Sequence, residues 1–249
     1  DMTNLASICQ AMIDEKIDFA VTIATPPSQA FLNMDSGIPM FFISVSNPVG
    51  AGIITEMAKP DKNATGTSNA IPVDEMFKLS DQLTPGCKTY GLIYCTSEVN
   101  SVTTANNAKA YMDQNGLNYV EAVVTNSGEV QQAAESLVGK VDAMFIPNDS
   151  VVQTALTVVA EVARDNKIPV YGSSAVMVAS GAFATISISD TEIGRMTADM
   201  CDQFLKGTAI ADIPAVTVSD FTMVINKTTA DAIGVTLSDD VLAQATVIE

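Results

Sequence analysis

The feature that most constrains the fold is the regular alternation of short apolar runs with helical segments. Apolar runs typical of buried strands lie at residues 17–24, 38–45, 88–95, 118–124, 141–147, 168–172, 182–189 and 221–226, and a short strand is expected near 64–68. Helical periodicity or helix caps mark residues 4–16, 50–59, 72–83, 101–115, 129–138, 151–166, 190–206 and 228–234, and a further helix opens at residue 25. Strands alternating with helices of this length are typical of βαβ units. We therefore predict an α/β fold with parallel sheets, a connecting strand at 212–218 and a helical or extended tail.

The same order of elements occurs twice along the chain. Lys-Ile-Asp at residues 16–18 matches Lys-Val-Asp at 140–142, an offset of 124 (140 − 16). Gly-Ile-Pro at residues 37–39 matches Lys-Ile-Pro at 167–169, an offset of 130 (169 − 39). Long-period self-similarity usually marks repeated structural units. We predict two similar, doubly wound parallel-sheet lobes.

The second copy begins with a strand–helix–strand, residues 88–124, whose counterpart in the first copy would fall before residue 1. We expect the first lobe to lack its opening βαβ unit in this sequence. The chain begins Asp-Met-Thr and shows no signal peptide, which is typical of a fragment or a processed form. Such a gap would leave a strand edge of the first sheet exposed or covered by a partner.

Composition excludes several classes of function. The chain has 12 basic and 29 acidic residues, a net charge of −17, so it would repel nucleic acid. Histidine is absent, which removes Ser-His-Asp catalysis and the commonest zinc sites. No C-x-x-C or G-x-G-x-x-G motif occurs, and no apolar run reaches about 18 residues. We expect no metal, no cofactor, no membrane span and no enzymatic activity.

Polar residues follow the predicted strands where each strand ends. In parallel sheets these positions share one edge, so two facing lobes would direct them into one ligand cleft. Hydroxyl groups near helix N-termini suit a carboxylate, and the one acid of the set suits an ammonium group. A helix cap, or an ordinary strand-to-loop exit, is the plain alternative for each residue. The candidate binding residues are Thr25, Ser28, Ser46, Asn47, Ser97, Asn100, Asn148, Asp149, Ser173 and Ser174.

Five segments resemble the ABC transporter substrate-binding family that includes binders of tryptophan and other aromatic amino acids. They are SVSNPVGAG, IATPPSQA, NATGTSNA, VQQAAESLVGKVDAMFIPNDS and IPVYGSSAVMVASGA. The resemblance implies a type I periplasmic-binding-protein fold, with two α/β lobes, three hinge crossings and the ligand between the lobes. It implies that lobe one comprises residues 1–69 and 190–211, and lobe two residues 70–189 and 212–249.

The resemblance also implies which residues meet the ligand. Lobe one would hold an amino-acid carboxylate through Thr25, Ser46 and Asn47. Lobe two would meet the amino group and side chain through Asp149, Ser173, Ser174 and the turn at residues 97–100.

The predicted function is that of an extracytoplasmic solute-binding protein that closes by hinge motion and delivers its ligand to an ABC permease in the membrane. Members of the resembled family carry a signal or lipoprotein anchor, which implies a periplasmic or lipid-anchored location. The alternative is the effector-binding core of a lactose-repressor-type transcription regulator, which shares the fold. An enzyme on this fold is the third hypothesis.

Overall fold

The computed structural model describes residues 4–70 and 72–249, which form two compact units. Unit 1 comprises Asp1–Ala70 and Ile188–Asp220, and unit 2 comprises Ile71–Ser187 and Phe221–Glu249. The second stretch of unit 1 is longer than the sequence analysis assigned, which ended it at residue 211. The reason is β9 (Val216–Thr217), which pairs with β3 (Ala64–Ser68) of unit 1.

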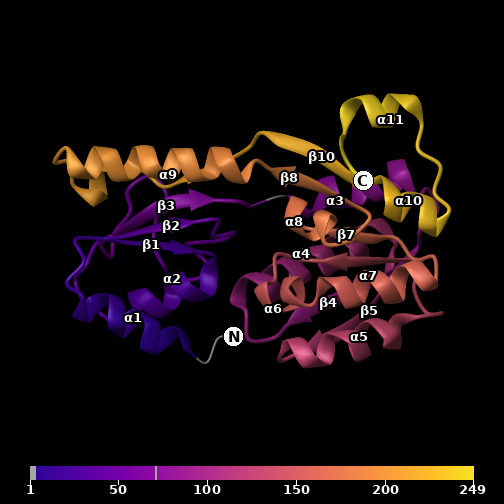
Figure 1. Ribbon diagram of the computed structural model, residues 1–249, viewed down its shortest axis with the longest axis horizontal. Coiled ribbons are helices and arrows are strands. Elements are labelled where there is room, and N and C mark those ends of the chain that lie inside the picture. The colour runs from indigo at the N-terminus through magenta and orange to yellow at the C-terminus, as the bar shows by residue number, and fades with distance from the viewer. Residues whose placement is uncertain (1–3, 71) are drawn as a thin grey trace. The chain divides into compact units, whose positions relative to one another are not determined.

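Unit 1 contains a four-stranded sheet in the order β1-β2-β3-β9, with β1 at Ala20–Ile23 and β2 at Met40–Ile43. All three strand pairs are parallel. Figure 1 shows helices on both faces of this sheet, with α1 and α2 on one side and α9 on the other. The helical segments are α1 (Leu5–Asp14), α2 (Thr25–Leu32), α9 (Asp190–Leu205) and η3 (Ile210–Asp212).

Neighbouring residues of β2 enter opposite faces of the unit 1 core. Phe42 packs with the cluster beneath α1 and α2, whereas Phe41 packs with Met200 of α9. The Phe41 ring meets Phe204 of α9 edge to face at 5.7 Å. A strand covered on both faces has no solvent side, which explains the continuous apolar run at 38–45.

Unit 2 contains a seven-stranded sheet in the order β11-β10-β8-β7-β6-β4-β5. Its strands are β4 (Thr89–Cys95), β5 (Asn118–Val124), β6 (Ala143–Ile146), β7 (Val170–Gly172), β8 (Ala184–Ile188), β10 (Phe221–Asn226) and β11 (Thr246–Ile248). The pairs of β4 with β5 and with β6 are parallel, as are β6–β7, β7–β8 and β10–β11. Because β5 lies on one side of β4 and β6 on the other, the strand order reverses between β4 and β6. Open α/β sheets bind ligands at such a switch point.

Helices cover both faces of the unit 2 sheet. Leu92 and Ile93, adjacent in β4, belong to the two different apolar clusters. One cluster includes residues of α3 (Val73–Leu83), α4 (Val99–Asn115), α10 (Lys227–Ile233) and α11 (Asp239–Gln244). The other includes residues of α5 (Val130–Leu137), α6 (Ser150–Thr154), α7 (Leu156–Asp165) and α8 (Ala175–Ala179). A short η2 turn (Ser127–Glu129) precedes α5. Both units are therefore doubly wound, as predicted.

Three local predictions were wrong. Residues 50–59 form turns and bends in place of a helix. There Asn47 Oδ1 accepts from Gly50 N at 2.8 Å, so the side chain closes a tight turn. The helix expected at 151–166 breaks at Ala155 into α6 and α7, and the strand expected at 212–218 shrinks to β9.

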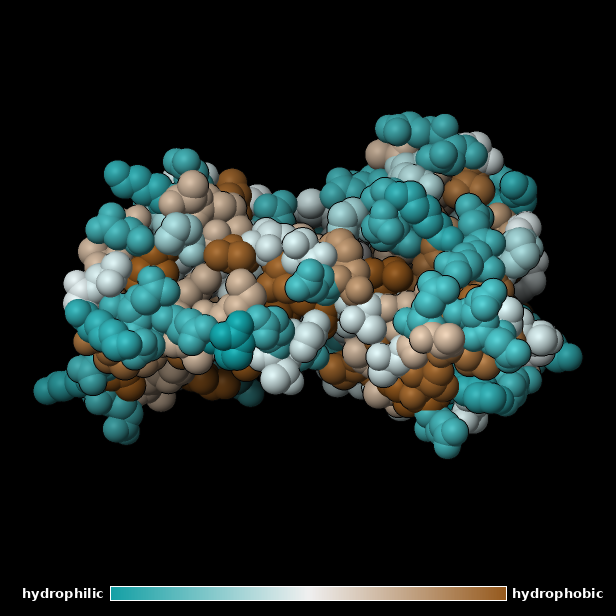
Figure 2. All heavy atoms as spheres, turned by 90° about the horizontal axis from the view of Figure 1, so that it is seen from above, coloured by the Kyte–Doolittle hydropathy of each residue, from teal (hydrophilic) through white to brown (hydrophobic). Residues whose placement is uncertain are grey.

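The surface of each unit is mixed. On the face drawn in Figure 2, hydrophilic side chains cover much of both units, with apolar side chains between them. None of the helices in the described part of the chain combines the length and the apolar character that a membrane crossing requires. The four cysteines are free thiols, and three of them are buried.

Candidate functional site

The unit 1 edge consists of the residues at and after the carboxyl ends of β1, β2 and β3, at 24–28, 44–47 and 68–69, and includes the first turn of α2. Its backbone is strained at two neighbouring points. Ala24 has φ 72° and ψ 167°, a combination that essentially only glycine adopts, and Ser44 has φ 56°. The two turns touch, since Ala24 N donates to Ile43 O at 2.9 Å. Strain of this kind concentrates at ligand-binding positions.

Side chains at the unit 1 edge are neutral hydrogen-bonding groups. Ser28 is fully buried and bonds to Thr22 at 2.8 Å and to Ala24 O at 2.7 Å, so its hydroxyl holds the turn together. Ser46 donates to Asn69 Oδ1 at 3.2 Å. Thr25 is 2% exposed, and its hydroxyl has no hydrogen-bond partner among the described residues. Of the predicted residues here, Thr25 retains the most capacity to bind a ligand.

The unit 2 edge consists of the residues that follow β4, β6 and β7, at 96–101, 147–150 and 173–174, and includes the first residues of α4 and α6. Asp149 is its most constrained side chain. One carboxylate oxygen accepts from Cys95 N at 2.5 Å, and the other accepts from Val152 N at 2.8 Å as the N-cap of α6. Asp149 is 3% exposed. Both oxygens thus already bind backbone N–H groups and tie the end of β4 to the start of α6.

Glu98 lies beside Asp149 and was missed by the sequence analysis. It is 1% exposed, and its carboxylate accepts from Ser150 N at 3.2 Å and from Val151 N at 3.1 Å. Burial, and secondly the negative charge of Asp149, raise the pKa of the Glu98 carboxyl above its ordinary value of 4.5. The available signal was an acid in the turn directly after a buried strand, two residues before an asparagine.

Asn100 and Asn148 join the same network. Asn100 Nδ2 donates to Asn148 O at 2.7 Å, and Ser101 Oγ donates to the same oxygen at 2.9 Å. Asn100 Nδ2 also lies 3.5 Å from a Glu98 carboxylate oxygen. The side-chain oxygen of Asn100 is buried and has no hydrogen-bond partner in the described part of the chain. The structure therefore brings Asn100, Asn148 and Asp149 together at the switch point.

The three remaining predicted serines have mainly structural contacts. Ser173 Oγ donates to Ile146 O at 2.7 Å, and Ser174 Oγ accepts from Met177 N at 3.2 Å as the N-cap of α8. The Ser97 hydroxyl is exposed and lies 3.0 Å from the Cys95 thiol. Ser173 and Ser174 thus fix the turn after β7, and Ser97 stands at the surface of the turn after β4.

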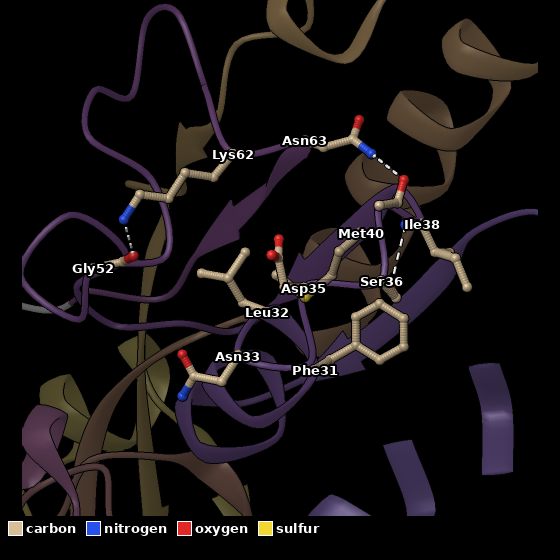
Figure 3. Close-up of a pocket in the computed structure, with 11 residues that line it drawn as sticks. Phe31, Leu32, Asn33, Asp35, Ser36, Ile38, Met40, Gly52, Lys62 and Asn63 are labelled. Atoms are coloured by element: carbon tan, nitrogen blue, oxygen red, sulfur yellow. Dashed lines mark hydrogen bonds between the residues drawn. The ribbon is translucent and has the colours of Figure 1, made fainter. Parts of the chain in front are cut away.

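A large pocket in unit 1, about 630 Å³, lies at the amino ends of β2 and β3 and so at the opposite edge of the sheet. Figure 3 shows two of its polar side chains bonded to backbone carbonyls: Lys62 Nζ donates to Gly52 O at 2.7 Å, and Asn63 Nδ2 to Gly37 O at 2.9 Å. Unit 2 has a pocket of about 410 Å³ at the amino ends of its strands, lined by Lys167, which matches Gly37 in the repeat. We attribute both pockets to the repeated fold, because ligands of open α/β sheets bind at the carboxyl ends.

Comparison with known proteins gives a consistent result. Residues 1–248 match the family described as ABC transporter substrate binding protein. A tyrosine-binding protein of Clostridioides difficile is 35% identical over 94% of this chain and 68% of its own length. A crystal structure of an ABC domain from Streptococcus pneumonia in complex with L-Trp is 32% identical, covers 100% of this chain and 84% of that chain, and superposes with a TM-score of 0.94.

The fold is also shared more widely. A LacI family transcriptional regulator from Bifidobacterium animalis superposes with a TM-score of 0.60 over 90% of this chain and 82% of its own, at 12% identity. At that identity the likeness shows the fold alone.

Proposed function

We propose that this chain, which belongs to the ABC transporter substrate-binding protein family, binds an aromatic amino acid for an ABC importer. The family is one of binding proteins and not of enzymes. The observation that carries the proposal is the pair of relatives above 30% identity, one a tyrosine-binding protein and the other a structure in complex with L-Trp. The regulator hypothesis has support from the fold alone.

In this proposal the two edges bind different ends of one amino acid. The unit 1 edge offers hydroxyl and amide groups and no ionisable side chain in its turns, which suits a carboxylate. Thr25, Ser46 and Asn47 are the residues proposed to meet it. The unit 2 edge contains two buried carboxylates, Glu98 and Asp149, which suit an ammonium group.

The remaining parts of the proposal concern the protein's setting. Hinge closure of the two units would trap the ligand and present it to a membrane permease. An extracytoplasmic location, in the periplasm or at the cell surface through a lipid anchor, agrees with that role. Family membership supports each of these statements.

Isothermal titration with the twenty amino acids tests the proposal. We expect L-tryptophan or L-tyrosine to bind with a Kd in the micromolar range or below, about 8 kcal/mol or more. Thr25→Val should weaken binding about tenfold, since a hydroxyl donor is lost. The control Ser136→Ala, in α5, should leave affinity unchanged. Absence of heat with both amino acids would refute the proposal.

A further inference from the structure

The buried carboxylates at the unit 2 switch point have no cationic partner among the residues that the structure describes. Glu98 and Asp149 are 1% and 3% exposed, and within residues 4–70 and 72–249 no lysine or arginine forms an ion pair with either. Two buried like charges are costly unless a cation or several hydrogen bonds compensate them. Their hydrogen-bond donors in the described part of the chain are backbone N–H groups and the Asn100 amide.

Capping of α6 does not explain why there are two carboxylates. Asp149 already caps the helix through Val152 N and also binds Cys95 N. Glu98 adds bonds of 3.1 and 3.2 Å to the same short helix, at the expense of burying a second charge. The hydrogen bonds of Glu98 to α6 therefore do not by themselves offset the cost of burying its charge.

A second observation points to a ligand group that donates hydrogen bonds. Asn100 is 6% exposed, and its side-chain oxygen is buried with no partner in the described residues. Buried acceptors are nearly always paired in native structures, and an unpaired one requires an explanation. The amide orientation is fixed, because Nδ2 donates to Asn148 O at 2.7 Å. Val99, which stands between Glu98 and Asn100 in the chain, is 44% exposed.

We propose that Glu98 and the Asn100 side-chain oxygen bind the α-ammonium group of the amino-acid ligand, an inference that rests on the function proposed above. An ammonium group has three donors and one positive charge. It would satisfy the Asn100 oxygen and compensate the carboxylate pair in one step. Glu98 is the charged residue that selects for an amino group, and Asp149 is a positioning residue that holds β4 against α6.

The test compares two ligands that differ only in the amino group, L-tryptophan and indole-3-propionate, in isothermal titrations of the unchanged protein and Glu98→Gln. Glutamine keeps an oxygen that can accept from α6 but loses the charge. We expect affinity for L-tryptophan to fall about 10- to 100-fold, the range of a charge-assisted hydrogen bond, and affinity for indole-3-propionate to change less than about threefold. Ser101→Ala is the matched control, because it removes a bond to the same Asn148 oxygen, and both affinities should stay the same.

Asn100→Leu should show the same selective loss, and it decides the matter if Glu98→Gln does not fold. Equal losses for both ligands, or no loss for either, would overturn the assignment of the ammonium site while the proposed function stands. Failure of the unchanged protein to bind L-tryptophan and L-tyrosine would refute the proposed function, and this inference with it.

Discussion

The turns after β1 and β2 in unit 1 and those after β6 and β7 in unit 2 occupy matching places in the repeat, yet their chemistry differs. Thr25 corresponds to Asp149 at the offset of 124 (149 − 25). Around Thr25 the backbone is strained, at Ala24 and Ser44, and the turns lack ionisable side chains. Around Asp149 the N-cap residues Asp149 and Ser174 have ordinary extended backbone, and a second buried carboxylate lies alongside.

This difference teaches that one βα architecture can present two kinds of polar edge. At the unit 1 edge the Thr25 hydroxyl has no hydrogen-bond partner among the described residues, whereas at the unit 2 edge the carboxylate oxygens of Glu98 and Asp149 accept from backbone N–H groups. An amino acid carries one charge of each sign, and in the proposed function each edge binds one of them.

The largest expected effect is a difference in stability loss when a glycine is replaced in the unit 1 sheet or in the unit 2 sheet. Gly66 in β3 has φ 156°, and a Cβ there would lie 1.9 Å from Phe42 O of the neighbouring strand. Gly66→Ala should therefore cost about 3 kcal/mol or more, since backbone must move. At Gly91 in β4 a Cβ would meet Leu137 Cδ1 at 2.6 Å, and that side chain can shift. Gly91→Ala should cost about 1 kcal/mol in urea unfolding followed by far-UV circular dichroism. If Gly66→Ala and Gly91→Ala lower the unfolding free energy by similar amounts, the close approach of β2 and β3 at Gly66 is contradicted.

The next largest effect is the difference in stability loss between substitutions at Asp149 and at Thr25, its counterpart in the repeat. Asp149→Ala should cost about 2 kcal/mol, because the α6 cap and the acceptor for Cys95 N are both lost. Thr25→Val should change stability by less than about 0.5 kcal/mol, since the hydroxyl has no partner among the described residues. All five tyrosines lie in unit 2, so tyrosine fluorescence isolates the Asp149 effect. Equal effects would show that the two edges do not differ as described.

A smaller gain tests the strain at the unit 1 edge. Ala24→Gly should stabilise the protein by about 1 kcal/mol, because glycine adopts this backbone conformation without strain. The control Ala20→Gly, in the buried part of β1, should destabilise by about 1 kcal/mol. Thermal unfolding of both variants measures the difference. If Ala24→Gly destabilises the protein, the backbone at Ala24 is not strained and strain does not distinguish the unit 1 edge.

The smallest effect is a pH dependence confined to the unit 2 edge. Because the folded-state pKa of Glu98 is raised, its contribution to stability is fully present below its ordinary value of 4.5 and is lost as pH rises through the raised pKa. The unfolding free energy of Glu98→Gln relative to the unchanged protein should therefore increase from about pH 4 towards neutrality. Urea titrations across this range measure it.

Glu121 provides a control of opposite sign. Hydrogen bonds from Lys109 and Tyr94 lower its pKa, so its contribution is present above the ordinary value and is lost as pH falls. Glu121→Gln should become relatively less stable as pH rises. The same trend in both variants would contradict the environment described for Glu98.

The sequence predicted the layered α/β fold because apolar runs and helix periodicity are local signals. Strands 64–68, 118–124 and 221–226 occur at the predicted bounds. It could not predict the turn at Asn47, where a side-chain bond replaces a helix, or the pairing of β9 with β3, which joins residues about 150 apart (216 − 67 = 149). It missed Glu98 because burial of that acid depends on β6 and α6 closing over the end of β4. Whether Thr25, Ser46, Asn47 and the unit 2 residues bind a ligand stays a prediction.

The most direct test of the central claim is a crystal structure of the protein with L-tryptophan. The account predicts the ammonium nitrogen within about 3.2 Å of Glu98 or of the Asn100 side-chain oxygen, and the carboxylate at the turns after β1 and β2. An ammonium group held by the unit 1 edge, or a ligand seated in the pocket between Phe31 and Asn63, would contradict it.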